Sequence, residues 1–497
     1  MKTLRTLLIL LLAISAHAAF VSSNIWEIEP TSGNDNYGCG WDSGSSGSDF
    51  STSLIQAFDG ASVECHNGGA GSTVTCSGDS PASNQVGNTL HVLSGTNFLV
   101  NFYRVTAINT GTHVYTLDKN VTSGAGSGMV GNFGGPCRSF FAGFMPLLGT
   151  GNAIYVKAES TIQVSTAIAT SVTGSVSATT PANRIVGYTS ARGDQGRVSL
   201  QMVTIATVAV AVVNSQWSIE NFDIDCNSIT NSTGVYVNAV GSSFVQILNT
   251  KVRGSCYCGM HIPTASAVMV SSDEITGVIG SAGVQSNASG VTVVSNSWIH
   301  DNTCDGIILT GPGTIMSNVI SNNTGASSDG VSVSNGNTQI IFNTVYNSGR
   351  DNIHSAAAAF PNSPMAFIKG NLLESPGRYN NVGGNTTAGT SASWRYDGNA
   401  YYLGSGTANR FDLDDTGTSC KICAIGTYTN TKDVIMTQSA LNNPGANDFT
   451  INTSTGGGLQ VRGNGWPQTI SGITVHGNPD FGPFQHPDPV GNGVWIQ

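Results

Sequence analysis

The chain has 497 residues and a formal net charge of −10; only 10% of the residues are charged, and 62 are glycine. Affinity for nucleic acid comes mainly from basic contacts to phosphates, so this composition argues against a nucleic-acid partner. Low charge combined with many Gly, Ser, Thr and Asn residues is typical of a turn-rich β protein.

Residues 1–18 have the pattern of a secretory signal. Lys2 and Arg5 precede the apolar run Leu7–Leu12, and Ala16 and Ala18 form a small-x-small cleavage site. No later segment contains the roughly 18 apolar residues that a membrane-spanning helix needs. We therefore expect a secreted protein, located outside the cell or at its surface.

All ten cysteines follow this signal, and an even number permits disulfides in an oxidising compartment. Cys420 and Cys423 form a C-x-x-C pair with no partner pair at zinc spacing, which favours a disulfide over a metal site. Cys256 and Cys258 lie two apart on an expected strand, where we expect that they cannot bridge each other without a bend.

Residues 19–150 lack any internal period and are predicted to form a β-rich cap, with hairpin strands near 88–93, 102–107 and 114–118. Residues 151–158 are expected to open a coil of strands that continues through 184–190 and extends to about residue 400. Residues 401–497 are predicted to be a closing region rich in β-strands and turns.

Six repeated phrases dominate residues 234–355: each is a turn followed by a short strand of alternating side chains. They begin at residues 234, 259, 283, 306, 330 and 352, which are 22 to 25 residues apart. A fixed period of this length predicts a solenoid whose repeats stack on one another. Each period has room for two or three short strands and none for a crossover helix. The strands of successive coils should therefore pair in parallel, about 4.8 Å apart.

Asparagine recurs at nearly the same point of most repeats, and Ser272 replaces it in one. An Asn at one bend of every coil can bond to the coils above and below, which predicts a structural ladder. The predicted ladder residues are Asn249, Asn296, Asn318, Asn343 and Asn371.

The repeated phrases and the recurring asparagine, together with the strands Ile154–Ala158 and Arg184–Tyr188, form a pattern that resembles the right-handed parallel β-helix repeat proteins of the pectate lyase-like superfold. The resemblance covers about residues 150–400. It implies an all-β fold with a right-handed parallel β-helix over residues 151–400. It implies little about activity, because this fold carries lyases, hydrolases, epimerases, phage spikes and non-enzymes.

Three aspartates are the best catalytic candidates, because each comes just before one of three consecutive phrases. Adjacent coils would place Asp305 and Asp329 about 5 Å apart, and Asp305 and Asp351 about 10 Å apart, near the separations of glycosidase carboxylate pairs. Calcium binding through oxygen ligands is an alternative. Ordinary turn chemistry, with Asp before Gly, is the favoured explanation. No metal site is assigned, and no cofactor is expected apart from that calcium alternative.

The outward column of the repeated strand has no Lys, Arg or carboxylate, so it lacks the base and the cation that a polysaccharide lyase needs. A binding role is open to four of its residues through ring stacking and hydrogen bonds to sugars, although plain solvation explains the same pattern. These four candidates are Tyr236, His261, Gln285 and His354.

These observations predict a secreted structural β-helix protein of the cell surface or extracellular space, associated with glycans. No helix is expected to cover the ends of the coil, and uncovered ends expose unpaired backbone groups, so we also expect end-to-end self-assembly into fibres. The expected partner is a second copy of the chain or an extracellular polysaccharide. The alternative is a polysaccharide hydrolase, or less favourably a lyase, that uses the carboxylates of adjacent coils; the sequence leaves open whether the chain is an enzyme.

Overall fold

The computed structural model describes residues 24–140, 151–170, 183–203, 208–229, 231–239, 244–334, 337–355, 366–377, 380–384, 394–402, 404, 409–412 and 433–462. The expected signal sequence and the pair Cys420 and Cys423 lie outside these ranges. The chain divides into two compact units, which are described separately. The first contains residues 1–163, 168–200 and 214–223, and the second contains the rest. Among the described residues, no helix is both long enough and apolar enough to cross a membrane.

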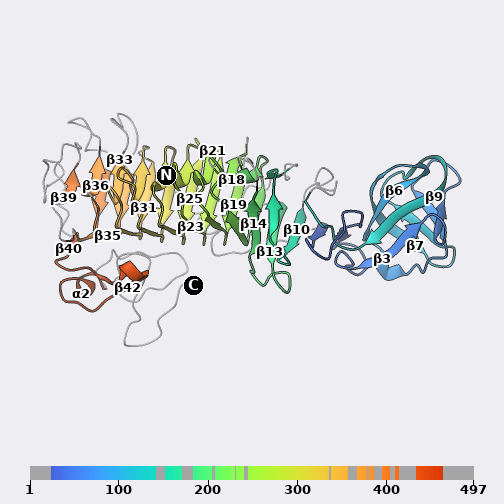
Figure 1. Cartoon of the computed structure of the whole chain (residues 1–497), viewed down its shortest axis with the longest axis horizontal. Coiled ribbons are helices and arrows are strands. Elements are labelled where there is room, and N and C mark those ends of the chain that lie inside the picture. The colour runs from blue at the N-terminus through green and yellow to red at the C-terminus, as the bar shows by residue number, and fades with distance from the viewer. Residues whose placement is uncertain are drawn as a thin grey trace, which may run out of the picture. The chain divides into compact units, whose positions relative to one another are not determined.

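The first unit contains an antiparallel seven-stranded sheet of order β3-β9-β6-β7-β8-β5-β4 (Figure 1). Its strands are β3 (Leu54–Asp59), β4 (Glu64–His66), β5 (Thr73–Ser77), β6 (Thr89–Phe98), β7 (Asn101–Asn109), β8 (Val114–Leu117) and β9 (Thr122–Gly134), with a 3₁₀ turn η1 (Ser83–Gln85). Alternate side chains such as Leu90 and Val92 fill one core, and the Cys65–Cys76 disulfide lies within it. The three hairpin strands expected here are present.

A parallel ladder begins in the same unit. β1 (Asn24–Ile28) pairs with β10 (Asn152–Lys157), β10 with β13 (Asn183–Tyr188), and β13 with β16 (Trp217–Glu220), all in parallel. The short strand β2 (Gly40–Asp42) pairs antiparallel with the free edge of β1, and the Cys39–Cys137 disulfide lies beside it. A strand from the region expected to be a separate cap therefore belongs to the parallel sheet.

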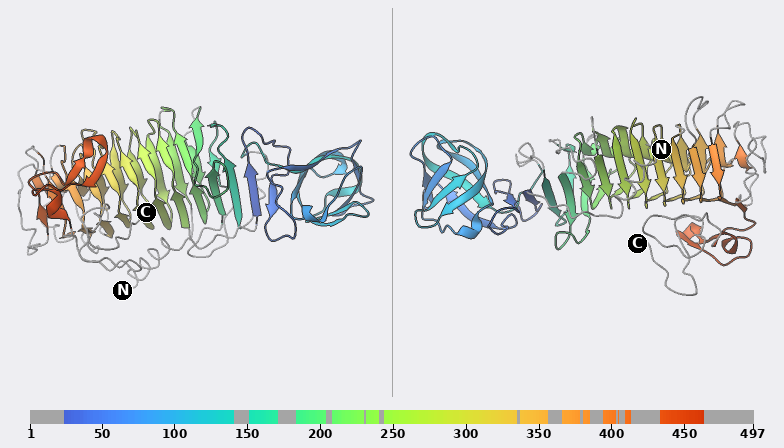
Figure 2. Two further views of the ribbon diagram at one scale, coloured as in Figure 1. Left: turned by 90° about the horizontal axis from the view of Figure 1, so that it is seen from below. Right: turned by 180° about the vertical axis from the view of Figure 1, so that it is seen from behind.

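The second unit consists mainly of three parallel sheets, and each coil contributes one strand to each sheet (Figure 2). The first sheet contains β19 (Phe244–Leu248), β22 (Ala267–Ser271), β25 (Val291–Ser295), β28 (Gly313–Met316), β31 (Thr338–Ile341), β34 (Ala366–Lys369) and β37 (Trp394–Asp397). The second contains β20 (Lys251–Arg253), β23 (Glu274–Thr276), β26 (Trp298–His300), β29 (Val319–Ser321), β32 (Thr344–Tyr346), β35 (Leu372–Glu374), β38 (Ala400–Tyr402) and β40 (Val434–Ile435).

The third sheet carries the six repeated phrases. Its strands are β15 (Val208–Val212), β18 (Thr233–Asn238), β21 (Cys258–Thr264), β24 (Ala282–Ser286), β27 (Asp305–Leu309), β30 (Val331–Val333), β33 (Ile353–Ser355), β36 (Asn380–Gly384) and β39 (Asn409–Asp412). The remaining strands at the start of the coil are β11 (Ile162–Val164), β12 (Ile168–Ala169), β14 (Val198–Met202) and β17 (Phe222–Asp225).

The register of the third sheet confirms the predicted parallel β-helix. Val235 pairs with Met260, and the column continues in parallel along the later phrases. All members of this column are fully buried: Val235, Met260, Val284, Ile307, Val331 and Ile353. Burying one such side chain contributes roughly 1.5–3 kcal/mol, so the repeated apolar position drives the stacking of the coils.

One bend carries a continuous buried ladder in which each backbone N–H donates to a side chain of the next coil. The Asn343 N–H donates to Asn371 Oδ1 at 2.9 Å, and Asn318 donates to Asn343 in the same way at 3.0 Å. The ladder residues in order are Thr250, Asp273, Ser297, Asn318, Asn343, Asn371, Asn399 and Asp433.

Two of the predicted ladder residues need correction. Asn249 and Asn296 lie one position earlier, with φ of 48° and 51°, and Thr250 and Ser297 take the ladder positions. The earlier position is left-handed in each coil from Asn249 to Gly398, and Ser272 occupies it too, with φ of 61°. Asn is favoured at both positions, once for its amide bonds and once for its tolerance of the left-handed conformation, and this explains the error.

Three disulfides are formed among the described cysteines: Cys39–Cys137, Cys65–Cys76 and Cys226–Cys256. As expected, Cys256 does not bridge Cys258. Cys258 and Cys304 are buried thiols.

The C-terminal described segment, residues 433–462, packs on the outward face of the second sheet. It contains β40, β41 (Leu441–Asn443), η4 (Pro444–Ala446), β42 (Asp448–Ile451) and the short helix α2 (Gly458–Val461). Leu441 and Phe449 from this segment share an apolar cluster with Val319 and Leu372 of the coil. The chain itself thus covers apolar side chains on this face of the coil.

Candidate functional site

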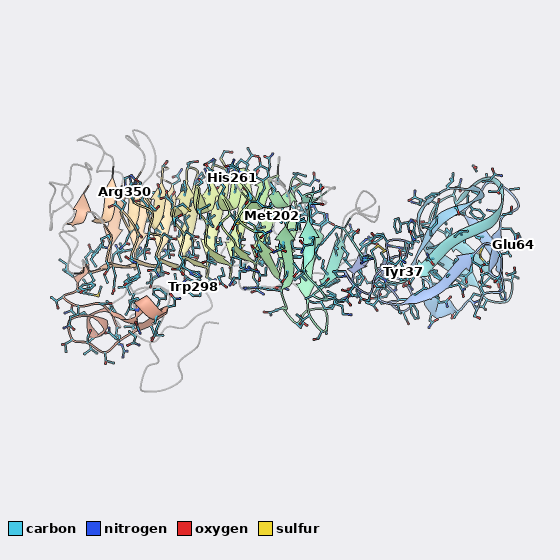
Figure 3. All side chains as sticks on the ribbon, in the orientation of Figure 1. Tyr37, Glu64, Met202, His261, Trp298 and Arg350 are labelled. Carbon is cyan, nitrogen blue, oxygen red and sulfur yellow. A yellow bond between two sulfur atoms is a disulfide. The ribbon has the colours of Figure 1, made fainter. Side chains whose placement is uncertain are left out.

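The outward column of the third sheet is in register, as the repeat predicts. Tyr236 pairs with His261, and the column continues through Gln285 and Ile308 to Ser332 and His354. The first four side chains are half-buried, whereas Ser332 and His354 are buried. The four predicted binding residues therefore share one face, but His354 contributes little exposed surface to it. Figure 3 shows His261 and Arg350 on one side of the coil and Trp298 on the other.

Tyr236 and His261 are in edge-to-face contact, with ring centroids 5.5 Å apart. Burial lowers the pKa of His261, because desolvation disfavours the charged ring. Its Nε2 atom is buried and has no protein hydrogen-bond partner. Gln285 accepts a hydrogen bond from Ser281 Oγ at 2.7 Å, which leaves its amide N–H groups for other partners.

The structure brings the three candidate aspartates together as a stack along the edge of this sheet. Asp305 Oδ1 accepts the Asp329 N–H at 2.7 Å, and Asp329 Oδ1 accepts the Asp351 N–H at 3.3 Å. The carboxylates of Asp305 and Asp329 therefore each hold the backbone of the next coil. These bonds join residues 24 and 22 positions apart, on different coils, so they are not local turn bonds, and the turn chemistry favoured from the sequence stays a prediction.

Arg350 and His354 contact the two buried members of the stack. Arg350 donates to both oxygens of Asp329, with Nε at 2.9 Å from Oδ1. His354 Nδ1 lies 3.1 Å from Asp351 Oδ2. The side chains of Asp329 and Asp351 are each only 1% exposed, so a substrate cannot reach them without a rearrangement.

Asp305 differs because it is half-buried. Burial and the neighbouring Asp329 charge raise its pKa from 3.8 to about 7. Burial also raises the pKa of Asp329, against the stabilising charge of Arg350. Of the three carboxyls, Asp305 alone combines some exposure with the proton affinity that a general acid needs.

A metal ion would compete with Arg350 at this stack. Ligand atoms of Asp329, Asp351 and His354 all lie within 4.8 Å of one another. Calcium prefers six to eight oxygen ligands, whereas this set includes an imidazole nitrogen and a carboxylate already paired with a guanidinium. These ligand atoms are thus poorly suited to calcium, and calcium binding stays a prediction.

Sequence reasoning missed two buried glutamates. Glu27 on β1 bonds to Tyr188 and Arg192, and Glu374 on β35 bonds to the C-terminal segment. Burial raises the pKa of each from 4.5 to about 7. The alternation Trp26-Glu27-Ile28-Glu29 was a usable signal, because it places two carboxylates on the face opposite two apolar residues.

No family model and no curated protein matches the chain. Solved structures that resemble it include a pectate lyase, Pel9A, at 15% identity over 71% of this chain and 92% of the other, with a TM-score of 0.46. The enzymatically active domain of tailspike protein 2 from bacteriophage CBA120 matches at 14% identity, covering 65% and 53%, with a TM-score of 0.41. The catalytic domain of a GH87 α-1,3-glucanase matches at 9% identity, covering 90% and 98%, with a TM-score of 0.26. These likenesses concern the fold alone.

Proposed function

We propose that the chain is an extracellular structural β-helix protein that binds a neutral polysaccharide along the third sheet. The observation that carries this proposal is the contrast between two neighbouring sets of side chains. Asp329 and Asp351 are buried and committed to backbone and Arg350, whereas Tyr236, His261 and Gln285 stay half-buried on adjacent coils.

The spacing of these three residues suits an extended chain of sugars. Successive coils repeat at about 4.8 Å, close to the length of one pyranose unit, so consecutive side chains can contact consecutive residues. The Tyr236 and His261 rings offer apolar faces for stacking, and the Gln285 amide offers hydrogen bonds to hydroxyls. A column with no cation disfavours acidic polysaccharides as ligands.

Binding of the mature protein to a panel of insoluble polysaccharides tests this proposal. We expect the double variant Tyr236→Ala, His261→Ala to lose at least tenfold in affinity for the polysaccharide that the wild type retains. Tyr257→Ala is the matched control, because Tyr257 is 47% exposed but lies outside the column. Retention of no polysaccharide by the wild type, or equal loss in the control, would refute the proposal.

A hydrolase is the second candidate, and the raised pKa of Asp305 is the observation that favours it. Its weakness is the partner carboxylate, because Asp329 is held by Arg350. New reducing ends released from a bound polysaccharide by the wild type and not by Asp305→Asn would establish this alternative. Binding without release supports the structural role.

Self-assembly into fibres remains a prediction. At the end of the parallel sheet formed by β1, the described residues do not favour it. In the first unit, β2 pairs with the edge of β1, and Trp41 of β2 in turn bridges to Asn88. A covered edge offers few free backbone groups for pairing with another chain.

A further inference from the structure

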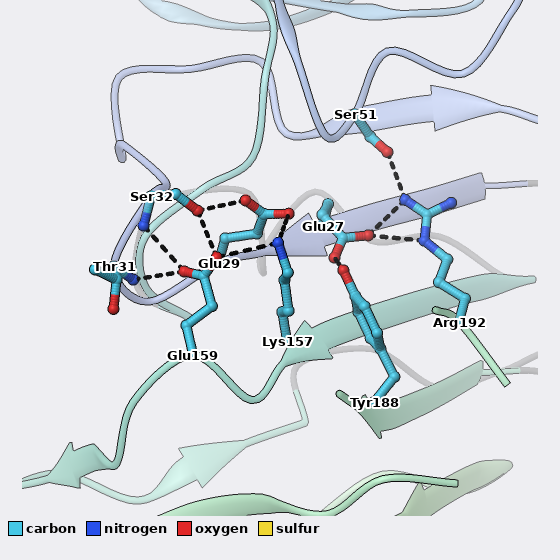
Figure 4. A network of polar contacts seen from close by, with 9 residues as sticks. All are labelled: Glu27, Glu29, Thr31, Ser32, Ser51, Lys157, Glu159, Tyr188 and Arg192. Atoms are coloured by element: carbon cyan, nitrogen blue, oxygen red, sulfur yellow. Dashed lines mark hydrogen bonds and ion pairs between the residues drawn. The ribbon is translucent and has the colours of Figure 1, made fainter. Parts of the chain in front are cut away.

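A polar network in the first unit joins segments that are far apart in sequence (Figure 4). Its centre is Glu27, whose side chain has no exposed surface. Arg192 Nε donates to Glu27 Oε2 at 2.8 Å, and the Tyr188 hydroxyl donates to Oε1. Arg192 also bonds to Ser51 Oγ at 2.8 Å and pairs with Asp49.

Arg192 therefore connects two different parts of the chain through Glu27. Glu27 lies on β1 of the parallel sheet, whereas Asp49 and Ser51 lie in the loop that leads into β3 of the antiparallel sheet. Arg192 comes from the loop after β13, and its guanidinium lies over the Tyr155 ring at 4.9 Å. The loop 49–51 is thus held to the coil by one arginine.

A second set of contacts fixes the next turn of the same segment. Lys157 Nζ lies 3.2 Å from Glu29 Oε1 and 3.1 Å from Glu159 Oε1. Glu159 Oε2 accepts the N–H groups of Thr31 and Ser32, each at 3.0 Å. These contacts leave Glu27 as the network's fully buried carboxylate beside Arg192.

The groups that face Glu27 do not compensate its charge fully. Arg192 and Tyr188 come from the coil, Glu29 lies directly after β1, and Asp49 lies in the loop before β3; Lys157 pairs with Glu29 instead. Burial is the largest influence and raises the pKa of Glu27 to about 7, outweighing the attraction of Arg192.

We propose that Glu27 is a pH-sensitive latch that decides how firmly Arg192 holds loop 49–51 to the coil. The direction of the pH dependence follows from the raised pKa of Glu27. In the closed network Glu27 keeps its proton up to about pH 7, whereas a Glu27 exposed by opening releases it near pH 4.5. The closed network is therefore stable in acid and opens more easily as pH rises through about 7. The proposal is independent of any polysaccharide binding.

Hydrogen exchange of the full chain, followed in peptides covering residues 27–33, 49–53 and 186–196, tests the latch. After correction for intrinsic rates, we expect wild-type protection in these peptides to fall on the order of tenfold from pH 5.5 to pH 8. Glu27→Gln, which stays neutral, should keep the acid-state protection at both pH values. Glu220→Gln is the matched control, because Glu220 lies on the same outward column and pairs with Arg184.

Glu27→Gln behaving like the wild type, or a wild type with no pH dependence, would overturn the proposal. If Glu27→Gln fails to fold, carbon-13 NMR of labelled glutamate carboxyls replaces it. The spectra are recorded on Glu374→Gln, which removes the other glutamate whose pKa is raised to about 7. A glutamate carboxyl that still titrates near pH 7 supports the latch; titration of every remaining glutamate near 4.5 refutes it.

Discussion

At the scale of single residues, the ladder shows how one residue type serves two adjacent positions. Asn343 is fully buried, and its side chain bonds to the coils on both sides. Asn296 is exposed and occupies the left-handed position before Ser297. Both residues looked alike in the sequence, but the structure assigns them different physical roles.

The two roles predict different costs of truncation. Asn343→Ala should lower the free energy of unfolding by about 3 kcal/mol, because it leaves buried backbone groups of neighbouring coils unpaired. Asn296→Ala should cost about 1 kcal/mol, the price of a left-handed alanine. Denaturant unfolding of both variants measures the difference, and equal losses would contradict the assignment.

Asp305 yields a second prediction at this scale. Because its pKa is raised to about 7, its stabilising neutral form is lost as pH rises through that value. Asp305→Asn keeps an oxygen for the Asp329 N–H and removes the titration. The loss develops between pH 3.8 and about 7, so we expect the stability advantage of the variant over the wild type to be larger at pH 8 than at pH 5, by roughly 1–2 kcal/mol. Unfolding midpoints of the wild type and the variant at the two pH values test this prediction. An advantage of the variant that is no larger at pH 8 than at pH 5 would contradict it.

At the scale of elements, the repeat made the third sheet predictable and the non-repeating segments unpredictable. A strand period of two and a coil period near 24 place Tyr236 beside His261 without further information. Glu27 and Arg192 are 165 residues apart and lie in segments with no repeat, so no local pattern pairs them. The aspartate stack is intermediate in predictability. The repeat predicts that the three aspartates lie in register, but it does not predict the ion pair between Asp329 and Arg350.

The C-terminal segment gives a prediction about one element. Glu374 has no exposed surface and accepts hydrogen bonds from Ser439 Oγ and the Ala440 N–H, at 2.6 and 2.7 Å. Glu374→Ala removes both acceptors, so we expect faster proteolysis within residues 433–462. Glu274→Ala is the control, because Glu274 lies on the same sheet but pairs with Lys251 at a partly exposed site.

The same segment should respond to pH. Burial raises the pKa of Glu374 to about 7, so docking is favoured in acid and weakens as pH rises through 7. Proteolysis of the wild type within residues 433–462 should therefore be slower at pH 5.5 than at pH 8, relative to an unfolded substrate at each pH. Equal relative rates, or no effect of Glu374→Ala, would show that the apolar cluster alone holds the segment.

At the scale of the whole molecule, the open question is whether copies of the chain associate. The sequence predicted uncovered ends, because no helix was expected to close the coil. In the first unit the strand edge is closed in another way, by β2 and by the Cys39–Cys137 disulfide that anchors the residue before it. Covering an edge with a short strand is a known means of preventing sheet extension.

The state of this edge can be changed with one substitution. Cys39→Ser removes the disulfide that holds β2, which should expose β1 and increase self-association. Sedimentation velocity over a range of concentrations measures the effect. Cys226→Ser is the matched control, because it breaks the Cys226–Cys256 disulfide of the second unit, in which Cys226 directly follows β17 and Cys256 precedes β21. We expect a monomeric wild type and control, and a variant that associates. Filaments formed by the wild type would instead show that β2 does not protect the edge, and would restore end-to-end assembly as the function of the repeat.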